Sequence, residues 1–285
     1  MREAQGRAGA LREVVRPVQA RDRPRYLAVF ERQARRVASQ VPTSFRVIKW
    51  RTLLGANWLL PTVLSTTAGA VDVIGFLALG GLFTAHITGN LVILAAHYVT
   101  GGFGQVGPLL SVPVFVAVLG AVTLVFGAAD KARASRRALL VLHAALLAGF
   151  LGLGAGFGPF ADADSATAVL VGMLGVAAMA TQNALVKLAL PGSPSTAVLT
   201  TNTTQLTIDL ATLARRRGQP DELARARRRA SVTFPCVVGF VLGCAAGAFL
   251  EVHFRLWALA LPVILAALAV PLGELWSDGR RDAGP

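Results

Sequence analysis

The sequence is poor in charged residues and in cysteine for its length. Charged residues occupy 15% of the 285 positions, whereas soluble domains carry about 25%. Hydrophobic residues reach 54% and the mean hydropathy is +0.58, which excludes an ordinary soluble domain and predicts a membrane protein with several spans. Cys236 and Cys244 lie eight positions apart on one predicted helix, so we expect no disulfide scaffold.

The short motifs of common enzyme classes are also missing. The sequence contains no P-loop, no nucleophile elbow and no zinc-protease helix. We therefore expect no enzyme activity and no cofactor. His86 and His97 lie eleven positions apart, but no third ligand follows at a matching spacing, so we expect no metal site.

The apolar residues form six runs with little or no charge. A helix needs about 20 residues to cross a membrane. Four of the runs have that length, and two are about twice as long. The long runs are 57–100 and 166–213, and the shorter ones are 109–129, 138–157, 231–250 and 256–273.

Lysine and arginine are concentrated between these runs, where they indicate the cytoplasmic side. Residues 1–56 carry 13 of them, residues 131–137 carry four and residues 214–230 carry seven. Basic residues at membrane borders, instead of on one folded face, argue against a nucleic-acid partner. With these segments inside, each half of the chain makes three net crossings, and both termini are cytoplasmic.

This count predicts an all-α polytopic bundle of six net crossings in the cell inner membrane. A basic cytoplasmic tail at 1–50, largely disordered or interfacial, would precede a membrane domain at 51–275 and a short cytoplasmic tail at 276–285. Repeat A would span 57–157 and repeat B 166–273. In the alternative, each long run is a two-span hairpin, which gives eight spans but places the second basic segment outside.

The chain contains one pattern twice, at a constant offset of 112 residues. Ala68, Gly80, Thr84, Ala85, Thr88, Asn90 and Leu94 recur as Ala180, Gly192, Thr196, Ala197, Thr200, Asn202 and Leu206. Alanine and leucine recur by chance in this composition, so the evidence is the glycine, threonine and asparagine matches. Because an odd number of crossings separates the two copies, we expect an inverted-topology repeat.

Each long run must bend or break within the membrane. A straight helix of 44 residues would be about 66 Å long, against a hydrocarbon core of about 30 Å. The expected breaks are Gly80 and Gly81 in the first run and the Pro-Gly-Ser-Pro sequence at 191–194 in the second. Paired broken segments predict a solute site between the two repeats.

Asp72 is the only formally charged residue between Thr52 and Ala129. A carboxylate in the middle of a span is costly and normally faces a partner or a cavity. We predict that it takes up a proton or binds a cation. The alternative is a structural role, with hydrogen bonds from a neighbouring helix or from Lys187. Its near-equivalent in the second half is Asn183, one residue out of register.

Polar side chains follow both breaks. The candidate binding residues are Thr84, His86, Thr88 and Asn90 after the first break and Thr200 and Asn202 after the second. A helix that restarts after Gly81 would present free N–H groups and its positive dipole end to an anionic group. The alternative is that these side chains bond across helices and hold the bundle together. Asp209 is expected to be a border residue near Arg215.

The segment 68–90 has a distinctive order: an aspartate, a double glycine with a phenylalanine, and then Thr-Gly-Asn. This order resembles the YoaK-like family of bacterial inner-membrane proteins, a family of unknown function usually described with six spans. The resemblance covers about 57–275 and implies location and span count but no substrate. Thr201 stands where a glycine is expected, so the second break is expected to differ in shape.

Two hypotheses follow from these observations. The first is a secondary transporter of a small polar or anionic solute, in which two repeats rock around a midplane site and Asp72 couples transport to a proton. The second is a non-transporting membrane protein whose polar residues hold the bundle together and whose basic tail recruits lipid or a partner. The expected partners are membrane lipid and a small solute, and a homo-oligomer is compatible with the sequence.

Overall fold

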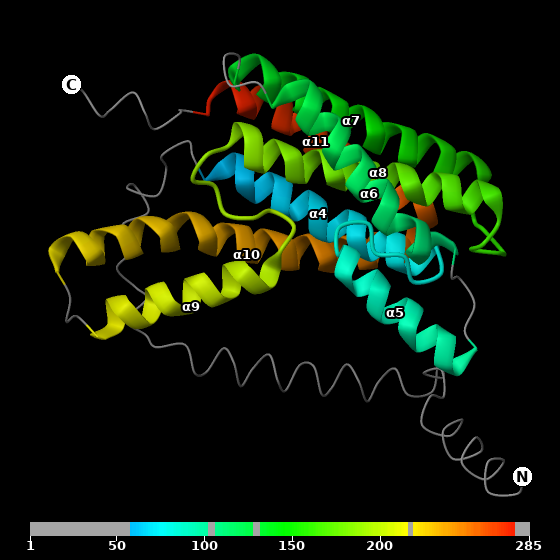
Figure 1. Cartoon of the computed structure of the whole chain (residues 1–285), viewed down its shortest axis with the longest axis horizontal. Coiled ribbons are helices and arrows are strands. Elements are labelled where there is room, and N and C mark those ends of the chain that lie inside the picture. Colours follow the sequence, from blue (N-terminus) through cyan, green and yellow to red (C-terminus); the bar gives the residue numbers. More distant parts are fainter. Residues whose placement is uncertain (1–57, 102–105, 128–131, 216–218, 277–285) are drawn as a thin grey trace, which may run out of the picture. The chain divides into compact units, whose positions relative to one another are not determined.

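The computed structural model describes residues 58–101, 106–127, 132–215 and 219–276. The predicted basic tail at 1–50 and the predicted C-terminal tail lie outside the described residues, apart from Trp276. Nearly all described residues are helical, and no strand occurs among them (Figure 1). The elements are α4 (Leu59–Ala78), α5 (Ile87–Thr100), α6 (Val106–Phe126), α7 (Ala132–Phe157), α8 (Ala166–Ala189), α9 (Leu199–Arg215), α10 (Pro220–Phe254), the 3-10 helix η3 (Arg255–Leu259) and α11 (Ala260–Glu274).

Five stretches of the described residues are long and apolar enough to cross a membrane: α4, α6, Ser135–Phe157 in α7, α8, and Pro220–Glu274. The last contains 55 residues, which would form about 80 Å of straight helix and therefore holds two crossings, α10 and α11. Helices α5 and α9 have 14 and 17 residues, fewer than the about 20 that a crossing needs. The predicted all-α polytopic bundle is confirmed.

Both long runs break where the sequence predicted. Gly80 and Gly81, just after α4, have φ angles of 65° and 90°, and Gly192, just after α8, has a φ of 78°. Residues with a Cβ rarely adopt this left-handed conformation, so glycine permits the turn. Each break separates a long helix from a shorter one.

The directions of the helices distinguish six crossings from eight. Near the start of α4, the carbonyl oxygen of Leu64 accepts a hydrogen bond from Gln182 near the end of α8, at 3.0 Å. Just after the end of α4, Leu79 Cδ1 lies close to Gly172 near the start of α8, where an added Cβ would be 3.4 Å from it. Helices α4 and α8 are therefore antiparallel. This fits α4, α6, α7 and α8 as spans one to four, whereas eight spans would make α8 the fifth and parallel to α4.

Helix α10 packs parallel to α4 through glycines spaced four residues apart. A Cβ at Gly239 would lie 2.8 Å from Thr66 Oγ1, and one at Gly247 would lie 2.9 Å from the carbonyl oxygen of Ala70. A Cβ at Gly243 would overlap the carbonyl oxygen of Thr66. Small residues at this spacing allow the backbones of membrane helices to approach closely.

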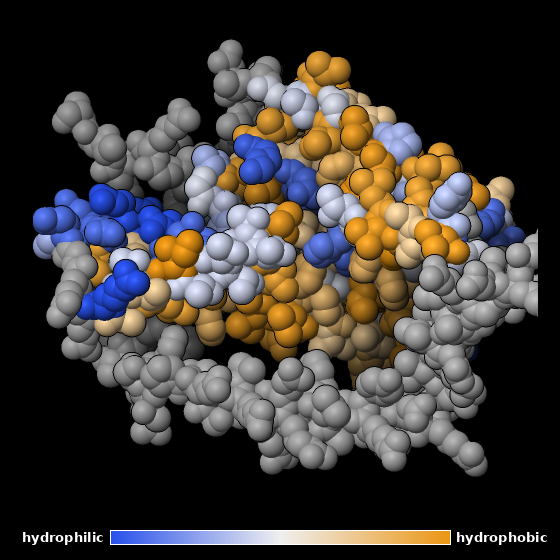
Figure 2. Space-filling model, turned by 60° about the horizontal axis from the view of Figure 1, so that its bottom comes forward, coloured by the Kyte–Doolittle hydropathy of each residue, from blue (hydrophilic) through white to orange (hydrophobic). Residues whose placement is uncertain are grey.

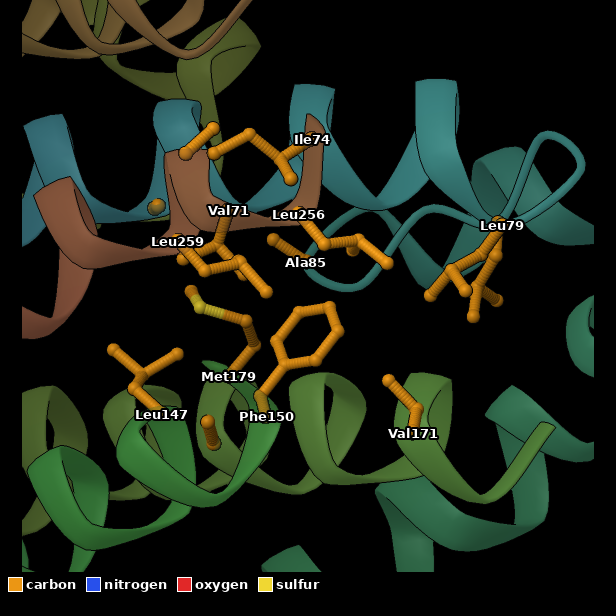
Figure 3. Packing of buried hydrophobic residues seen from close by; sticks show 14 of the residues in the cluster. Val71, Ile74, Leu79, Ala85, Leu147, Phe150, Val171, Met179, Leu256 and Leu259 are labelled. Carbon is orange, nitrogen blue, oxygen red and sulfur yellow. The ribbon is translucent and has the colours of Figure 1, made fainter. Parts of the chain in front are cut away.

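Buried hydrophobic side chains fill the space between α4, α7, α8 and η3 (Figure 3). Val71 from α4, Phe150 from α7, Met179 from α8 and Leu259 from η3 belong to one cluster. Ala85 belongs to it as well, although it lies in the loop between α4 and α5. That loop is therefore packed inside the bundle.

One basic residue of the predicted cytoplasmic loop has a different role from the expected border anchor. Arg136 on α7 is 2% exposed, and its guanidinium donates to the carbonyl oxygens of Ala189 at 3.4 Å and Trp276 at 3.5 Å. Ala189 is the last residue of α8. Unpaired carbonyl groups and the negative end of the helix dipole favour a cation there, so Arg136 caps α8 at the second break.

Candidate functional site

Asp72 lies inside the bundle and is held by the loop that follows α4. Its side chain is 6% exposed. Its Oδ1 accepts hydrogen bonds from the Ala85 N–H at 2.7 Å and the Thr84 hydroxyl at 3.3 Å, and its Oδ2 lies 2.5 Å from His86 Nδ1. Three consecutive loop residues thus surround the carboxylate. Lys187, considered as a partner from the sequence, is exposed and forms none of these contacts.

The loop reaches Asp72 because it folds back along the helix that it has just left. Asp72 lies six residues before the end of α4, which is about 9 Å along the helix axis. After the turn at Gly80 and Gly81, residues 82–86 return beside the last turns of α4. Helix α5 therefore begins beside Asp72 and runs in the same sense as α4 (Figure 1).

Glycines on two helices make room for this loop. A Cβ at Gly75 of α4 would lie 3.0 Å from Thr84 Cγ2, and a Cβ at Gly175 of α8 would lie 2.9 Å from the same atom. Leu82 packs in the same way on Gly172 of α8, where a Cβ would lie 2.5 Å from its Cδ2. The first-half loop is thus seated against a helix of the second half.

His86 connects the buried carboxylate with the protein surface. Its side chain is 36% exposed, and its ring meets Phe83 and Phe240 edge-on, with centroids 6.0 and 5.7 Å apart. When Nδ1 carries the proton that bonds Asp72, Nε2 is left to exchange a proton with its surroundings. Such a pair can pass a proton between the surface and the buried Asp72 carboxylate.

Asn90 closes the loop through its amide. Its Oδ1 accepts from the Phe83 N–H at 2.8 Å, and its Nδ2 donates to the Phe83 carbonyl at 2.7 Å and to Ser111 Oγ at 2.8 Å. The side chain is fully buried. Because both ends of the amide bind protein groups, Asn90 clamps the loop onto α5 and α6.

Asn202 occupies the corresponding place at the second break. Its Nδ2 donates to the carbonyl oxygen of Ser195, seven residues earlier, as Asn90 does to Phe83. Ser195 and Phe83 are themselves 112 positions apart. The repeat in the sequence therefore corresponds to a repeated loop clamp, with fewer hydrogen bonds in the second copy.

Gln182, not Asn183, takes the place of Asp72 at the second break. Gln182 Nε2 donates to Thr196 Oγ1 at 2.9 Å, and Thr196 is the counterpart of Thr84. Asn183 instead donates to the carbonyl oxygen of Met179 on its own helix. The side chain that binds the counterpart of Thr84 is therefore Gln182, whereas Asn183, the predicted near-equivalent of Asp72, binds its own helix.

The remaining predicted site residues lie apart from Asp72. Thr88 on α5 and Thr200 on α9 are exposed on their helices. Asp209, predicted as a border residue near Arg215, instead has Arg229 as its partner. Asp209 is fully buried, and Arg229 of α10 contacts it through two nitrogens, with Nη2 to Oδ1 at 2.6 Å.

Several residues of these networks escaped the sequence reasoning. Ser111 and Arg229 carry no local signal, because their partners are far along the chain. Thr196 was visible through its offset of 112 from Thr84, whereas Gln182 has no such match. Within the described ranges, no group of three or more His, Cys, Asp or Glu side chains could hold a metal ion.

The fold and the loop define a class: a multi-pass α-helical membrane protein with a buried carboxylate held by a broken-helix segment. A model of the family described as "Protein of unknown function (DUF1275)" matches residues 60–272. The chain belongs to this family. It is 60% identical over 38 residues to the UPF0700 transmembrane protein YoaK of Bacillus subtilis (strain 168), a match that covers 13% of this chain and 16% of that protein. The resemblance to the YoaK-like family is thereby confirmed. No solved structure matches the chain.

Proposed function

We propose that the protein is a secondary transporter of a small polar or anionic solute in the cell inner membrane, and that Asp72 and His86 couple transport to a proton. The observation that carries the proposal is the buried Asp72 carboxylate joined to the half-exposed ring of His86. Ionisable groups inside a membrane are costly and commonly belong to proton relays and solute pathways.

The packing of the helices supports a second part of the proposal, that the two halves are inverted repeats. Helix α4 packs on α10 and α8 on α6; α5 packs on α6 and α9 on α10; α7 packs on α8 and α11 on α4. Exchanging each first-half helix for its second-half counterpart leaves this list unchanged. The counterparts α4 and α8 are antiparallel, as inversion requires.

In the proposed mechanism, protonation of Asp72 controls how strongly the loop is bound to α4. The ionised Asp72 accepts charge-assisted hydrogen bonds from Thr84, Ala85 and His86, which are about twice as strong as neutral ones. Protonation of the carboxylate weakens them and frees the loop. The N–H groups at the start of α5 then become available to the solute, and the halves rock to the other orientation.

The test is uptake by proteoliposomes that contain the purified protein, measured with a panel of labelled organic acids, amino acids and polyols under an imposed proton gradient. Asp72→Asn preserves size and removes the titrating group, so we expect it to abolish gradient-driven uptake. Asp209→Asn is the matched control, because it neutralises another buried carboxylate, bound to Arg229. Uptake that survives Asp72→Asn, or no uptake across the panel, would argue against the proposal.

A second function is favoured by the hydrogen bonds that the predicted site residues form within the protein. Asn90, Asn202 and Asp72 all bind groups of the protein itself, as expected of a membrane protein that transports nothing and whose basic tail recruits lipid or a partner. This alternative predicts that Asp72→Asn lowers stability without changing any flux. It also predicts that removal of residues 1–50 abolishes function, whereas transport requires only the membrane domain.

A further inference from the structure

The two short helices that follow the breaks present different surfaces. Buried residues of α9 form one stripe, Asn202, Leu206 and Asp209, that faces the protein. Its opposite face at the start of the helix is exposed and hydroxylated: Thr200, Thr201, Thr203, Thr204 and Thr207. In Figure 2, a pale area of intermediate hydropathy lies between the blue basic end of the molecule and the orange hydrophobic surface.

Helix α5 is the internal comparison, because its residues correspond to those of α9 at the offset of 112. Leu91 stands for Thr203 and Val92 for Thr204, and these two apolar side chains are 50% and 70% exposed. An exposed apolar face suits lipid, so α5 has the surface expected of a lipid-facing helix. The corresponding positions on α9 carry threonines and do not form such a surface.

Exposed threonines on other helices of this protein bond to their own helix. The hydroxyls of Thr100 and Thr123 donate to carbonyl oxygens four residues earlier. Thr207 on the threonine face does the same, donating to the carbonyl oxygen of Thr203, but across the part of the chain that the structure describes the hydroxyls of Thr203 and Thr204 form no hydrogen bond. Leaving a hydroxyl without a partner in an apolar medium costs about 2 kcal/mol or more, so this face needs a hydrogen-bonding neighbour.

A buried polar side chain at the second break also has a hydrogen-bonding atom without a partner within the described residues. Gln182 is fully buried. Its Oε1 has no hydrogen-bond partner within the described residues. Gln182 binds Thr196, which precedes the first turn of α9 by three residues. Unpaired polar groups at membrane depth are tolerated where they line a wet cavity.

We propose that the threonine face of α9 borders water and forms the cytoplasmic approach to the polar pair Gln182–Thr196. The basic residues beyond the far end of α9, such as Arg225 and Arg229, place that end at the cytoplasmic border. Water occupies this approach, and a hydrophilic solute can enter with it. This inference rests on the proposed function and names the side from which the solute reaches the second break, but its test requires no transport.

The test is cysteine accessibility with a membrane-impermeant, positively charged methanethiosulfonate. Thr203→Cys, Thr204→Cys and Thr207→Cys are compared with the matched variants Leu91→Cys, Val92→Cys and Ala95→Cys in inverted vesicles, whose cytoplasmic face is outside, and in right-side-out vesicles. The background carries Cys236→Ala and Cys244→Ala. If that background does not fold, the increase over the unmodified parent is measured instead.

We expect the α9 variants in inverted vesicles to react at least about tenfold faster than their α5 counterparts, because only a thiol in water ionises and meets the reagent. Equal rates on the two helices would overturn the proposal, as would reaction only in right-side-out vesicles. Oxidant-induced dimers that form while the thiols stay protected from the reagent would also overturn it, since the face would then bind a second copy. Labelling without any measurable uptake would support the approach while refuting transport.

Discussion

Replacing Asn90 by alanine should weaken the protein more than the same change at Asn202. Asn90→Ala removes one buried and two part-buried hydrogen bonds and leaves the Phe83 N–H, the Phe83 carbonyl and the Ser111 hydroxyl without this partner. An unsatisfied buried group costs about 1–3 kcal/mol. Ser111 retains its bond to the Pro108 carbonyl, so we expect a loss of about 2–5 kcal/mol in the free energy of unfolding.

Asn202→Ala is the matched control, because it removes one hydrogen bond, to the Ser195 carbonyl, and should cost about 1–2 kcal/mol. The assay is unfolding of the purified protein in mixed micelles, monitored by reaction of a thiol-specific dye with the buried Cys236. Asn90→Asp should be at least as damaging as Asn90→Ala, because it replaces both amide donors with a charge beside the Phe83 carbonyl. Equal losses for Asn90→Ala and Asn202→Ala would refute the clamp.

Two further predictions concern the packing of α10 on α4 and the ion pair between Asp209 and Arg229. Gly243→Ala should lower the free energy of unfolding by about 2 kcal/mol or more, because the added Cβ would overlap the Thr66 carbonyl. Gly152→Ala on α7 is the control, because a Cβ added there meets no neighbouring side chain or helix within 4 Å. It should be neutral or stabilising by up to about 1 kcal/mol. The same unfolding assay checks both, and equal effects would exclude the close packing of α4 and α10. Arg229→Gln should destabilise by about 1–3 kcal/mol, because the buried charge of Asp209 would lose its cationic partner and keep the hydrogen bond from Gln205. The exposed Arg228→Gln should change stability by less than about 0.5 kcal/mol. Adding Asp209→Asn to Arg229→Gln should restore part of the loss, and a further loss instead would contradict the pairing.

The sequence was sufficient for the features that depend on local chemistry. Gly80, Gly81 and Gly192 mark the breaks because only glycine readily takes positive φ. Asp72 stands out because it is the one charge in a long apolar segment, and burial of that charge requires partners. The offset of 112 located both loop clamps, since Asn90 and Asn202 each bind a residue seven positions earlier.

The roles of individual side chains depended on three-dimensional contacts that no spacing shows. Asn90 was predicted to face a solute, and instead the structure shows its amide bound to Phe83 and Ser111. The return of the loop along α4, which brings His86 to Asp72, follows from packing against Gly75 and against α8. The burial of Arg136 and Asp209 results from neighbouring helices, whereas the charge-asymmetry rule considers only their positions in the sequence.

Proton movement during solute uptake is the most direct measurement of the central claim. Proteoliposomes that hold a pH-sensitive dye are given the solute identified by the uptake panel, without an imposed proton gradient. We predict that internal pH changes with uptake for the unmodified protein and for Asp209→Asn, and that Asp72→Asn eliminates the change. Solute uptake with constant internal pH, or a pH change that persists in Asp72→Asn, would contradict the role of Asp72 and His86 as the proton-coupling pair.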